Sequence, residues 1–303
     1  MAARAPTRAA ARASAATAGR GRVRAPAACV AAGGADGGNS EGLRGKIEWS
    51  ALPEVGVGTI AWGDDSYGFG NAFREPDVRA AFDAARDAGI AFFDTAEVYG
   101  YKSGKYEQSA EHLLGHFCNE AAQGAGDGSD GVFVGSKVFT IPWTNAIMGG
   151  GFRTGREQLV AACRDSVARL GGRQLDLWSI HFPFPTFKQA VLMDALEEAM
   201  DLGLVKAVGV SNYDAGQLEE AHELLERRGI QLSSNQVKYS LLAREPESSG
   251  LLLKCAERGV KLVAYSPLDG GKLAKGDTAS DAKVSGCAIA RCSARTRVGR
   301  HCR

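Results

Sequence analysis

The stretch GIAFFDTAEVYG, residues 89–100, joins a short apolar run to a group of polar side chains. Its apolar part, residues 90–94, is dense in aliphatic and aromatic residues, which is typical of a strand buried on both faces of a parallel sheet. Asp94 ends this run, and Tyr99 follows five residues later. The stretch therefore predicts a buried strand that delivers a carboxylate and a phenol to one end of a sheet.

Six further runs of this kind lie along the chain, and amphipathic segments separate them. One such segment places apolar residues at helical spacing from Val78 to Ala85. Thr154 and Glu157 have the spacing of a capping box, and Asp214 is a candidate cap for a later helix. The alternation of strands and helices predicts repeated βαβ units. The seven strand-like runs are 55–60, 90–94, 132–137, 175–181, 205–211, 232–237 and 261–266.

Such a chain fits either a doubly wound open sheet or an α/β barrel. Almost every run ends in a polar residue, and these ends converge on one mouth in a barrel, whereas an open sheet spreads them along an edge. We therefore predict an α/β fold of the (β/α)8 TIM-barrel type. It should be incomplete, because no run after Leu273 can supply the eighth β/α unit. The polar ends are Thr59, Asp94, Lys137, His181, Ser211, Asn212, Gln236 and Ser266.

Composition divides the chain into three parts. Residues 1–40 contain 16 Ala and six Arg but one acidic residue, and they lack Leu, Ile and all aromatic residues. This composition cannot form a core, and an Arg-rich, acid-poor segment is typical of an organelle transit peptide. We predict a disordered transit-peptide-like leader at 1–45, the barrel domain at 46–275 and an unstructured tail at 276–303.

Charge, hydrophobicity and cysteine content argue against nucleic-acid or membrane partners, a disulfide framework and a metal site. The chain has 303 residues, with 36 Lys and Arg against 35 Asp and Glu, so no global field favours nucleic acid or an anionic membrane. No apolar run is long enough to cross a membrane. The seven cysteines are widely spaced and form no C-x-x-C pair, which speaks against a disulfide framework and against a metal site. We expect a monomer that binds neither nucleic acid nor membrane.

Four polar residues form a candidate catalytic group. Lys137 ends the run after Asp94, and His181 ends the next one, so the three should meet Tyr99 at the barrel mouth. An adjacent ammonium lowers the pKa of a phenol, and Asp94 can keep Lys137 charged. His181 can donate a hydrogen bond to a carbonyl oxygen and so polarise it for an incoming hydride. Taken singly, Asp94 and Lys137 also fit a structural ion pair, and His181 fits a hydrogen-bonded core histidine.

Seven stretches of the chain together resemble the aldo-keto reductase superfamily, and they look most like its chloroplast members of plant type. The resemblance covers about residues 50–275 and implies an NADP-dependent oxidoreductase. The matching stretches are VGVGTIAWGDDSYG (55–68), GIAFFDTAEVYG (89–100), VGSKV (134–138), RLGGRQLDLWSIHFP (169–183), GLVKAVGVSNY (203–213), SSNQVKYSLL (233–242) and VKLVAYSPL (260–268).

The resemblance implies an activity of the alcohol dehydrogenase or carbonyl reductase type, in which NADPH reduces an aldehyde or ketone. It implies a catalytic tetrad of Asp94, Lys137, His181 and Tyr99, with Tyr99 as the proton donor. It also implies three groups of cofactor contacts. Ser211, Asn212 and Gln236 would bind the nicotinamide carboxamide, Tyr265 would stack on the nicotinamide ring, and Ser266 and Leu268 would lie in the segment that holds the pyrophosphate.

The resemblance ends after Leu273, where family members continue through further barrel elements that contact the adenosine 2′-phosphate. We therefore expect a truncated chain, and the preference for NADPH over NADH follows from the resemblance. One alternative is a nicotinamide-binding regulatory subunit, and another is an inactive truncated fragment. His181 favours turnover, because channel-associated β-subunits of the superfamily carry Asn there. The leader and the resemblance favour the chloroplast, with the mitochondrion or cytoplasm as alternatives.

Aromatic residues near the strand ends are further candidates for the substrate pocket. The small-molecule carbonyl substrate would meet an apolar wall formed by residues in the loops that leave the strands. These candidates are Trp62, Tyr67, Phe139, Trp143, Phe182 and Phe184.

Overall fold

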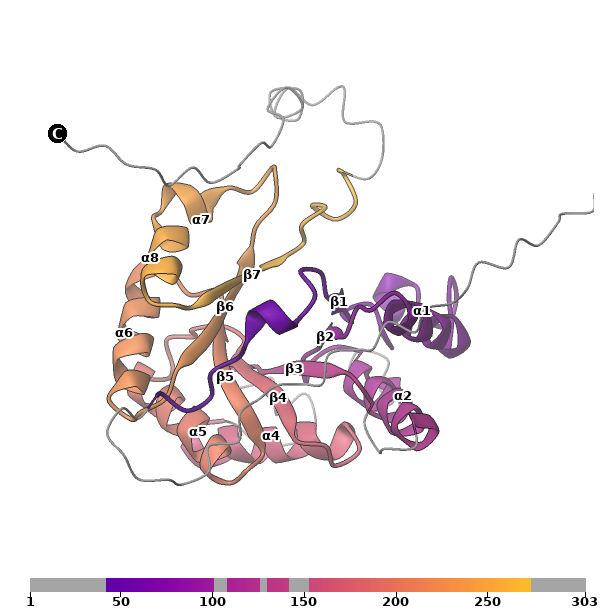
Figure 1. Ribbon diagram of the computed structural model, residues 1–303, viewed down its shortest axis with the longest axis horizontal. Helices are drawn as coiled ribbons and strands as arrows, with labels where there is room; N and C mark the ends of the chain where they lie inside the picture. The colour runs from indigo at the N-terminus through magenta and orange to yellow at the C-terminus, as the bar shows by residue number, and fades with distance from the viewer. Residues whose placement is uncertain (1–41, 101–107, 126–129, 142–152, 274–303) are drawn as a thin grey trace, which may run out of the picture.

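The computed structural model describes residues 42–100, 108–125, 130–141 and 153–273, and within them seven strands form one sheet. All neighbouring strands are parallel and follow one another in chain order (Figure 1). Each strand overlaps one of the seven predicted runs, so this part of the prediction is confirmed. The strands are β1 (Val57–Gly58), β2 (Phe92–Asp94), β3 (Phe133–Val138), β4 (Leu175–Ile180), β5 (Val205–Ser211), β6 (Leu232–Lys238) and β7 (Lys261–Tyr265).

Helices connect successive strands and lie around the outside of the curved sheet (Figure 1). Their apolar faces pack on the strands, which is the arrangement that repeated βαβ units produce. The helices are α1 (Glu75–Asp87), α2 (Ala110–Ala125), α4 (Arg156–Arg169), α5 (Gln189–Asp201), α6 (Ala215–Glu226), α7 (Glu245–Ser248) and α8 (Leu251–Glu257), with 3-10 turns η1 (Trp49–Ala51) and η2 (Asp65–Tyr67).

The two predicted helix caps have different outcomes. Asp214 caps α6 as expected, because its carboxylate accepts a hydrogen bond of 2.8 Å from the Gln217 amide. The capping box predicted from Thr154 is wrong. Helix α4 starts at Arg156, and Gly155 is its cap without a side-chain hydrogen bond. Thr154 therefore lies one residue too early to cap the helix.

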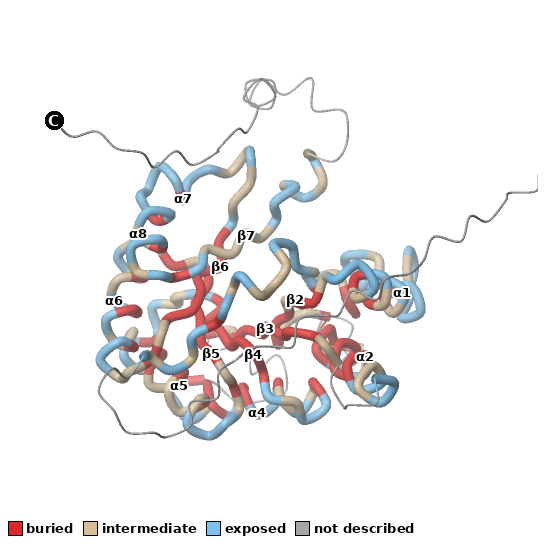
Figure 2. The backbone as a smooth tube through the Cα atoms, in the orientation of Figure 1, coloured by how far each residue is buried: buried red, intermediate tan, exposed pale blue. Residues whose placement is uncertain are grey.

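The fold class is confirmed as an α/β barrel that is incomplete within the described residues. Strands β1 and β7 are the two edges of the sheet, and within the described residues no pairing joins them. Strand β7 pairs with β6, and its residues are exposed or half-buried on both faces, whereas β3 and β4 are buried throughout (Figure 2). The first 41 residues and the predicted tail lie outside the described residues.

The interior of the curved sheet has an apolar end and a polar end. Near the amino ends of the strands, Ile47 packs with Phe92 and Phe133, and Trp49 packs against this cluster. The Trp49 indole donates a hydrogen bond of 3.2 Å to the Ser233 carbonyl, which attaches the N-terminal segment to β6. This segment covers the interior at the amino end, so an interior site has to open at the carboxyl ends of the strands.

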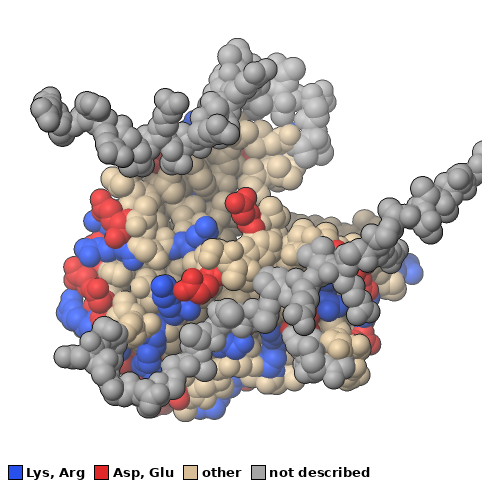
Figure 3. Space-filling model, viewed as in Figure 1, with Lys and Arg blue, Asp and Glu red and all other residues tan. Residues whose placement is uncertain are grey.

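The surface carries both signs of charge. On the face shown in Figure 3, Lys and Arg side chains are interspersed with Asp and Glu, as the near-zero net charge of the sequence implies. No helix in the described ranges combines the length and the apolar character that a membrane span requires.

Candidate active site

The pleat of the strands places the predicted catalytic side chains inside the barrel. Successive residues of a strand point to opposite faces, so Asp94 shares a face with Phe92 of the interior cluster, while Phe93 packs outward under the helices. Lys137 likewise shares the interior face of β3 with Phe133. The pairing of β2 with β3 sets Asp94 opposite Gly135, so Lys137 lies two residues further toward the carboxyl end and its long side chain reaches Asp94.

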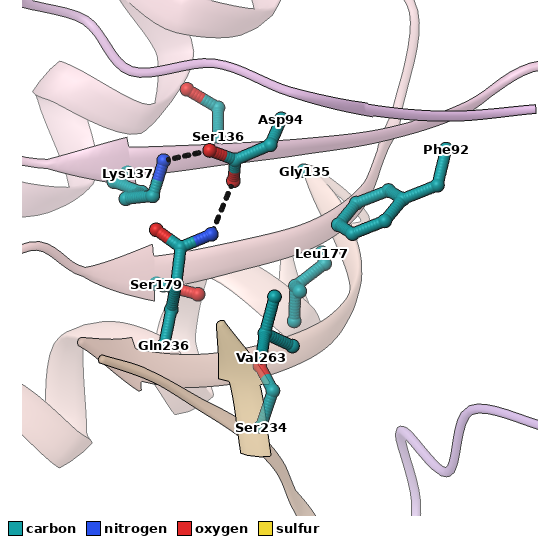
Figure 4. A pocket seen from close by; sticks show the side chains of 10 residues that line it. All are labelled: Phe92, Asp94, Gly135, Ser136, Lys137, Leu177, Ser179, Ser234, Gln236 and Val263. Carbon is teal, nitrogen blue, oxygen red and sulfur yellow. Dashed lines mark hydrogen bonds and ion pairs between the residues drawn. The ribbon is translucent and has the colours of Figure 1, made fainter. Parts of the chain in front are cut away.

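Asp94 is the centre of a hydrogen-bonded group in this interior (Figure 4). Its Oδ2 accepts a bond of 2.8 Å from Lys137 Nζ, and its Oδ1 accepts a bond of 2.9 Å from Gln236 Nε2. Lys137 Nζ also donates to the Thr95 carbonyl at 2.7 Å. These side chains line a cavity between β2, β3, β4, β6 and β7 whose other walls are Phe92, Gly135, Ser136, Leu177, Ser179, Ser234 and Val263.

Tyr99 lies beside Lys137, as the sequence predicts. It stands in a turn after β2, in which its amide donates to the Ala96 carbonyl at 3.0 Å. Its own carbonyl accepts a bond of 3.1 Å from the Ala110 amide at the start of α2. The Lys137 ammonium is 5.1 Å from the centroid of the Tyr99 ring. The phenol, the ammonium and the Asp94 carboxylate therefore form one group.

The net effect on the phenol corrects one prediction. Burial raises the pKa of Tyr99, and this outweighs the Lys137 charge and hydrogen bond, which lower it. The pKa of Tyr99 is thus above its ordinary value, whereas the ammonium alone would place it below. For Lys137, burial lowers the pKa, but Asp94 and Tyr99 together raise it further than burial lowers it. At neutral pH the site therefore holds a neutral phenol next to an ammonium.

His181 follows β4 and lies beside Tyr99. The two rings meet edge to face with their centroids 5.9 Å apart, and Phe139 makes a similar contact with the imidazole at 5.3 Å. Phe182 stacks on the imidazole at 5.0 Å. Burial and then the Lys137 charge lower the pKa of His181 to about 3, so the imidazole is neutral at physiological pH. Its Nδ1 is buried and has no hydrogen-bond partner within the described residues.

The residues assigned to the cofactor by resemblance form a second cluster at the carboxyl ends of β5, β6 and β7. Ser211 Oγ donates to the Gln236 carbonyl at 2.7 Å. Asn212 has a left-handed backbone, with φ of 61°, and its Nδ2 donates to the His181 carbonyl at 3.0 Å. Tyr265 Oη donates to Asn212 Oδ1 at 3.0 Å. Gln236 belongs to both clusters, because its side chain binds Asp94.

The two remaining predicted cofactor residues lie in the loop that follows β7. Ser266 has a left-handed backbone with φ of 51°, and its carbonyl accepts a bond of 2.9 Å from the Asp269 amide. Leu268 is exposed in the same loop. The structure thus places them in the loop directly after Tyr265.

The aromatic candidates for the substrate pocket have different positions. Phe139 and Phe182 border His181. Trp62 is buried in the main core, where its ring contacts Phe93, so it acts as a packing residue. Tyr67 is exposed. Trp143 lies outside the described residues.

Two residues beside the site were not among the candidates from the sequence. Glu97 and Arg153 form an ion pair in which each side chain is 2% exposed. Glu97 belongs to the stretch 89–100, between Asp94 and Tyr99, so its position was visible in the sequence. Nothing in the sequence pairs it with Arg153, which lies 56 residues later.

Comparison with known proteins shows consistent similarity over most of the chain. A model of the aldo/keto reductase family matches residues 54–292 and so runs past Leu273, where the recognisable motifs end. The chloroplastic pyridoxal reductase of Arabidopsis thaliana is 36% identical over 226 residues, which are 74% of this chain and 59% of that protein. The chain thus spans less than two thirds of the length of that relative.

Two further matches concern a bacterial enzyme and a solved structure. A methylglyoxal reductase of Escherichia coli is 32% identical over 227 residues, which are 75% of this chain and 68% of that protein. A crystal structure of an aldo-keto reductase from Klebsiella pneumoniae in complex with NADPH is similar with a TM-score of 0.58 and 27% identity. That similarity covers 77% of this chain and 72% of the other.

Proposed function

The chain belongs to the aldo/keto reductase family, and from this premise we propose that it reduces an aldehyde or ketone to the alcohol with NADPH. The observation that carries the proposal is the Lys137 ammonium, which is buried, bonded to Asp94 at 2.8 Å and placed beside the Tyr99 ring. A buried cation next to a neutral phenol is suited to proton donation, because it stabilises the phenolate that remains.

The cluster at the ends of β5 to β7 supports nicotinamide binding. Asn212 and Gln236 carry amides that both donate and accept hydrogen bonds, Ser211 adds a hydroxyl, and Tyr265 adds an aromatic ring. These groups match the chemistry of a carboxamide on a flat ring. When bound, NADPH supplies the hydride for the carbonyl carbon. The Klebsiella pneumoniae relative that was solved with NADPH supports the choice of cofactor.

In the proposed reaction Tyr99 acts as the general acid. Its hydroxyl donates a proton to the carbonyl oxygen as negative charge develops there. Lys137 stabilises the resulting phenolate, and Asp94 holds the ammonium in place. His181 is neutral at the working pH, and a neutral imidazole carries one N–H, which donates to the same carbonyl oxygen. Both donors then stabilise the oxygen on which charge appears.

The names of two relatives and the aromatic residues beside His181 indicate which substrates to test first. Two relatives are named as reductases of pyridoxal and of methylglyoxal, so small aldehydes are the first substrates to examine. The aromatic side chains of Phe139 and Phe182 around His181 favour a substrate with an apolar or flat part.

The Arg-rich composition of residues 1–40 and the chloroplastic relative support the chloroplast as the location. A fluorescent-protein fusion to residues 1–45 in plant cells tests that location.

A direct assay decides between an enzyme and a regulatory subunit. The purified chain is mixed with NADPH and a panel that includes pyridoxal, methylglyoxal and simple aromatic aldehydes, and cofactor oxidation is followed by absorbance. We expect turnover of at least one aldehyde, with a higher kcat/KM for NADPH than for NADH. A chain that binds NADPH tightly but turns over no carbonyl of the panel would favour the regulatory alternative.

A further inference from the structure

A buried ion pair between Glu97 and Arg153 lies next to the backbone segments that carry the proposed catalytic residues. Arg153 Nη2 donates to Glu97 Oε2 at 2.8 Å, and Arg153 Nη1 donates to the other carboxylate oxygen. Both side chains are 2% exposed. Taking two charges out of water costs several kcal/mol per ion, and apolar residues of similar volume often do as well for stability. Stability alone therefore does not explain why these two charged side chains are buried.

The pair holds both backbone groups of Phe139. The Phe139 amide donates to Glu97 Oε1 at 2.5 Å, and its carbonyl accepts from Arg153 Nη1 at 2.7 Å. Phe139 lies two residues after Lys137 and directly follows β3. The Glu97 amide in turn donates to the Lys137 carbonyl at 3.2 Å. The turn that carries Tyr99 is thus joined to the end of β3 through both side-chain and backbone bonds.

The contacts around Phe139 extend to the end of β4, where His181 lies. The Phe139 ring meets His181 edge to face at 5.3 Å and Phe182 at 5.6 Å. Thr140, the next residue, donates from Oγ1 to the Phe182 carbonyl at 2.6 Å. Fixing the backbone at Phe139 therefore fixes the ring that borders the imidazole. Tyr99, Lys137 and His181 each lie one or two residues from a group in this network.

We propose that Glu97 and Arg153 are positioning residues, whose buried pair fixes Tyr99, Lys137 and His181 relative to one another at the barrel mouth. The pair touches none of the reacting atoms and acts through the turn 96–99 and through Phe139. This inference rests on the proposed reductase function, because positioning matters for a reaction whose donors must reach one oxygen. A displacement of about 1 Å in such a site can lower a rate by about 100-fold.

The test compares two matched carboxylate-to-amide variants. Glu97→Gln retains an oxygen that can accept from Phe139 but leaves Arg153 without its charged partner. Asp176→Asn is the control. Asp176 is also buried, accepts from a β3 amide, that of Val134, at 2.8 Å, and pairs with Arg173 and Lys206 at the start of β4. It differs in lying at the opposite end of β4 from His181.

We expect Glu97→Gln to lower kcat by about 10- to 100-fold, with KM for the aldehyde and Kd for NADPH changed less than about twofold. Asp176→Asn should lose a similar amount of unfolding free energy in urea and keep kcat within about twofold. A kcat of Glu97→Gln within about twofold of the wild type would overturn the proposal. An equal loss of kcat in both variants would also overturn it, because the effect would then follow stability.

Two additions keep the test decisive. If Glu97→Gln does not fold, the double variant Glu97→Gln with Arg153→Met removes both charges, and the same loss of kcat is expected. If the wild type reduces no carbonyl, the proposed function fails, and the imidazole resonances of His181 test the positioning by NMR. They should move more in Glu97→Gln than in Asp176→Asn, and equal or absent movement would overturn the inference.

Discussion

Tyr99 experiences two opposing influences, since burial favours its neutral form and Lys137 favours its phenolate. The neutral form prevails at rest, which is the form that a proton donor needs. We predict that Tyr99→Phe lowers kcat by about 100- to 10,000-fold, because general acid catalysis contributes about that factor. The Kd for NADPH should change little, since Tyr99 lies outside the cofactor cluster formed by Ser211, Asn212, Gln236 and Tyr265. Retention of wild-type turnover, measured by NADPH oxidation, would remove Tyr99 from the mechanism.

His181 gives the folded protein a pH dependence of stability. Its pKa falls from 6.5 in the unfolded chain to about 3 in the fold, first through burial and then through the Lys137 charge. Between these values the unfolded state binds the extra proton, so stability is present above pH 6.5 and is lost as the pH falls towards 3.

This linkage can be measured with one variant. From about pH 7.5 to about pH 5 the wild type should lose about 2 kcal/mol more unfolding free energy than His181→Asn, which has no such proton to bind. Urea denaturation of both proteins at the two pH values measures the difference. Equal losses in the two proteins would show that the imidazole titrates normally in the fold.

Among the elements, α2 and α4 meet at a glycine. A Cβ on Gly115 of α2 would lie 2.6 Å from the backbone of Leu170 at the end of α4. Gly124, near the end of the same helix, has no atom within 4 Å of such a Cβ. Substitution at the first position therefore forces two backbones apart, whereas substitution at the second meets open space.

We predict opposite effects for the two alanine variants. Gly115→Ala should lower the unfolding free energy by about 1–3 kcal/mol through overpacking. Gly124→Ala should leave it unchanged or raise it by up to about 1 kcal/mol, because alanine favours a helix. Urea denaturation compares both with the wild type. A neutral Gly115→Ala would mean that the helices separate without cost.

On the scale of the whole molecule, ligand binding should be visible as stability. The cofactor cluster includes residues of β5, β6 and β7, and β7 is a sheet edge that has no buried residue. A ligand that binds the folded state at 100 times its Kd adds about 2.7 kcal/mol of stability. We predict that such a concentration of NADPH raises Tm by about 5–10 °C.

Thermal unfolding with and without NADPH checks this, and removal of NADPH by gel filtration should restore the original Tm. AMP at the same concentration is the control for nonspecific binding. An unchanged Tm together with unchanged NADPH fluorescence would contradict cofactor binding by this chain.

The sequence by itself determined where the strands lie along the chain and which residues end them, because hydrophobic runs and polar ends are local properties of the chain. Asp94, Lys137 and His181 could be named from these local patterns alone. The tertiary structure decided what depends on distance and burial between remote segments. It set the net direction of the Tyr99 pKa, since burial depends on everything packed around the ring. It also joined Gln236 to Asp94 and Arg153 to Glu97, because a strand pattern shows which side chains face inward and leaves open which of them meet.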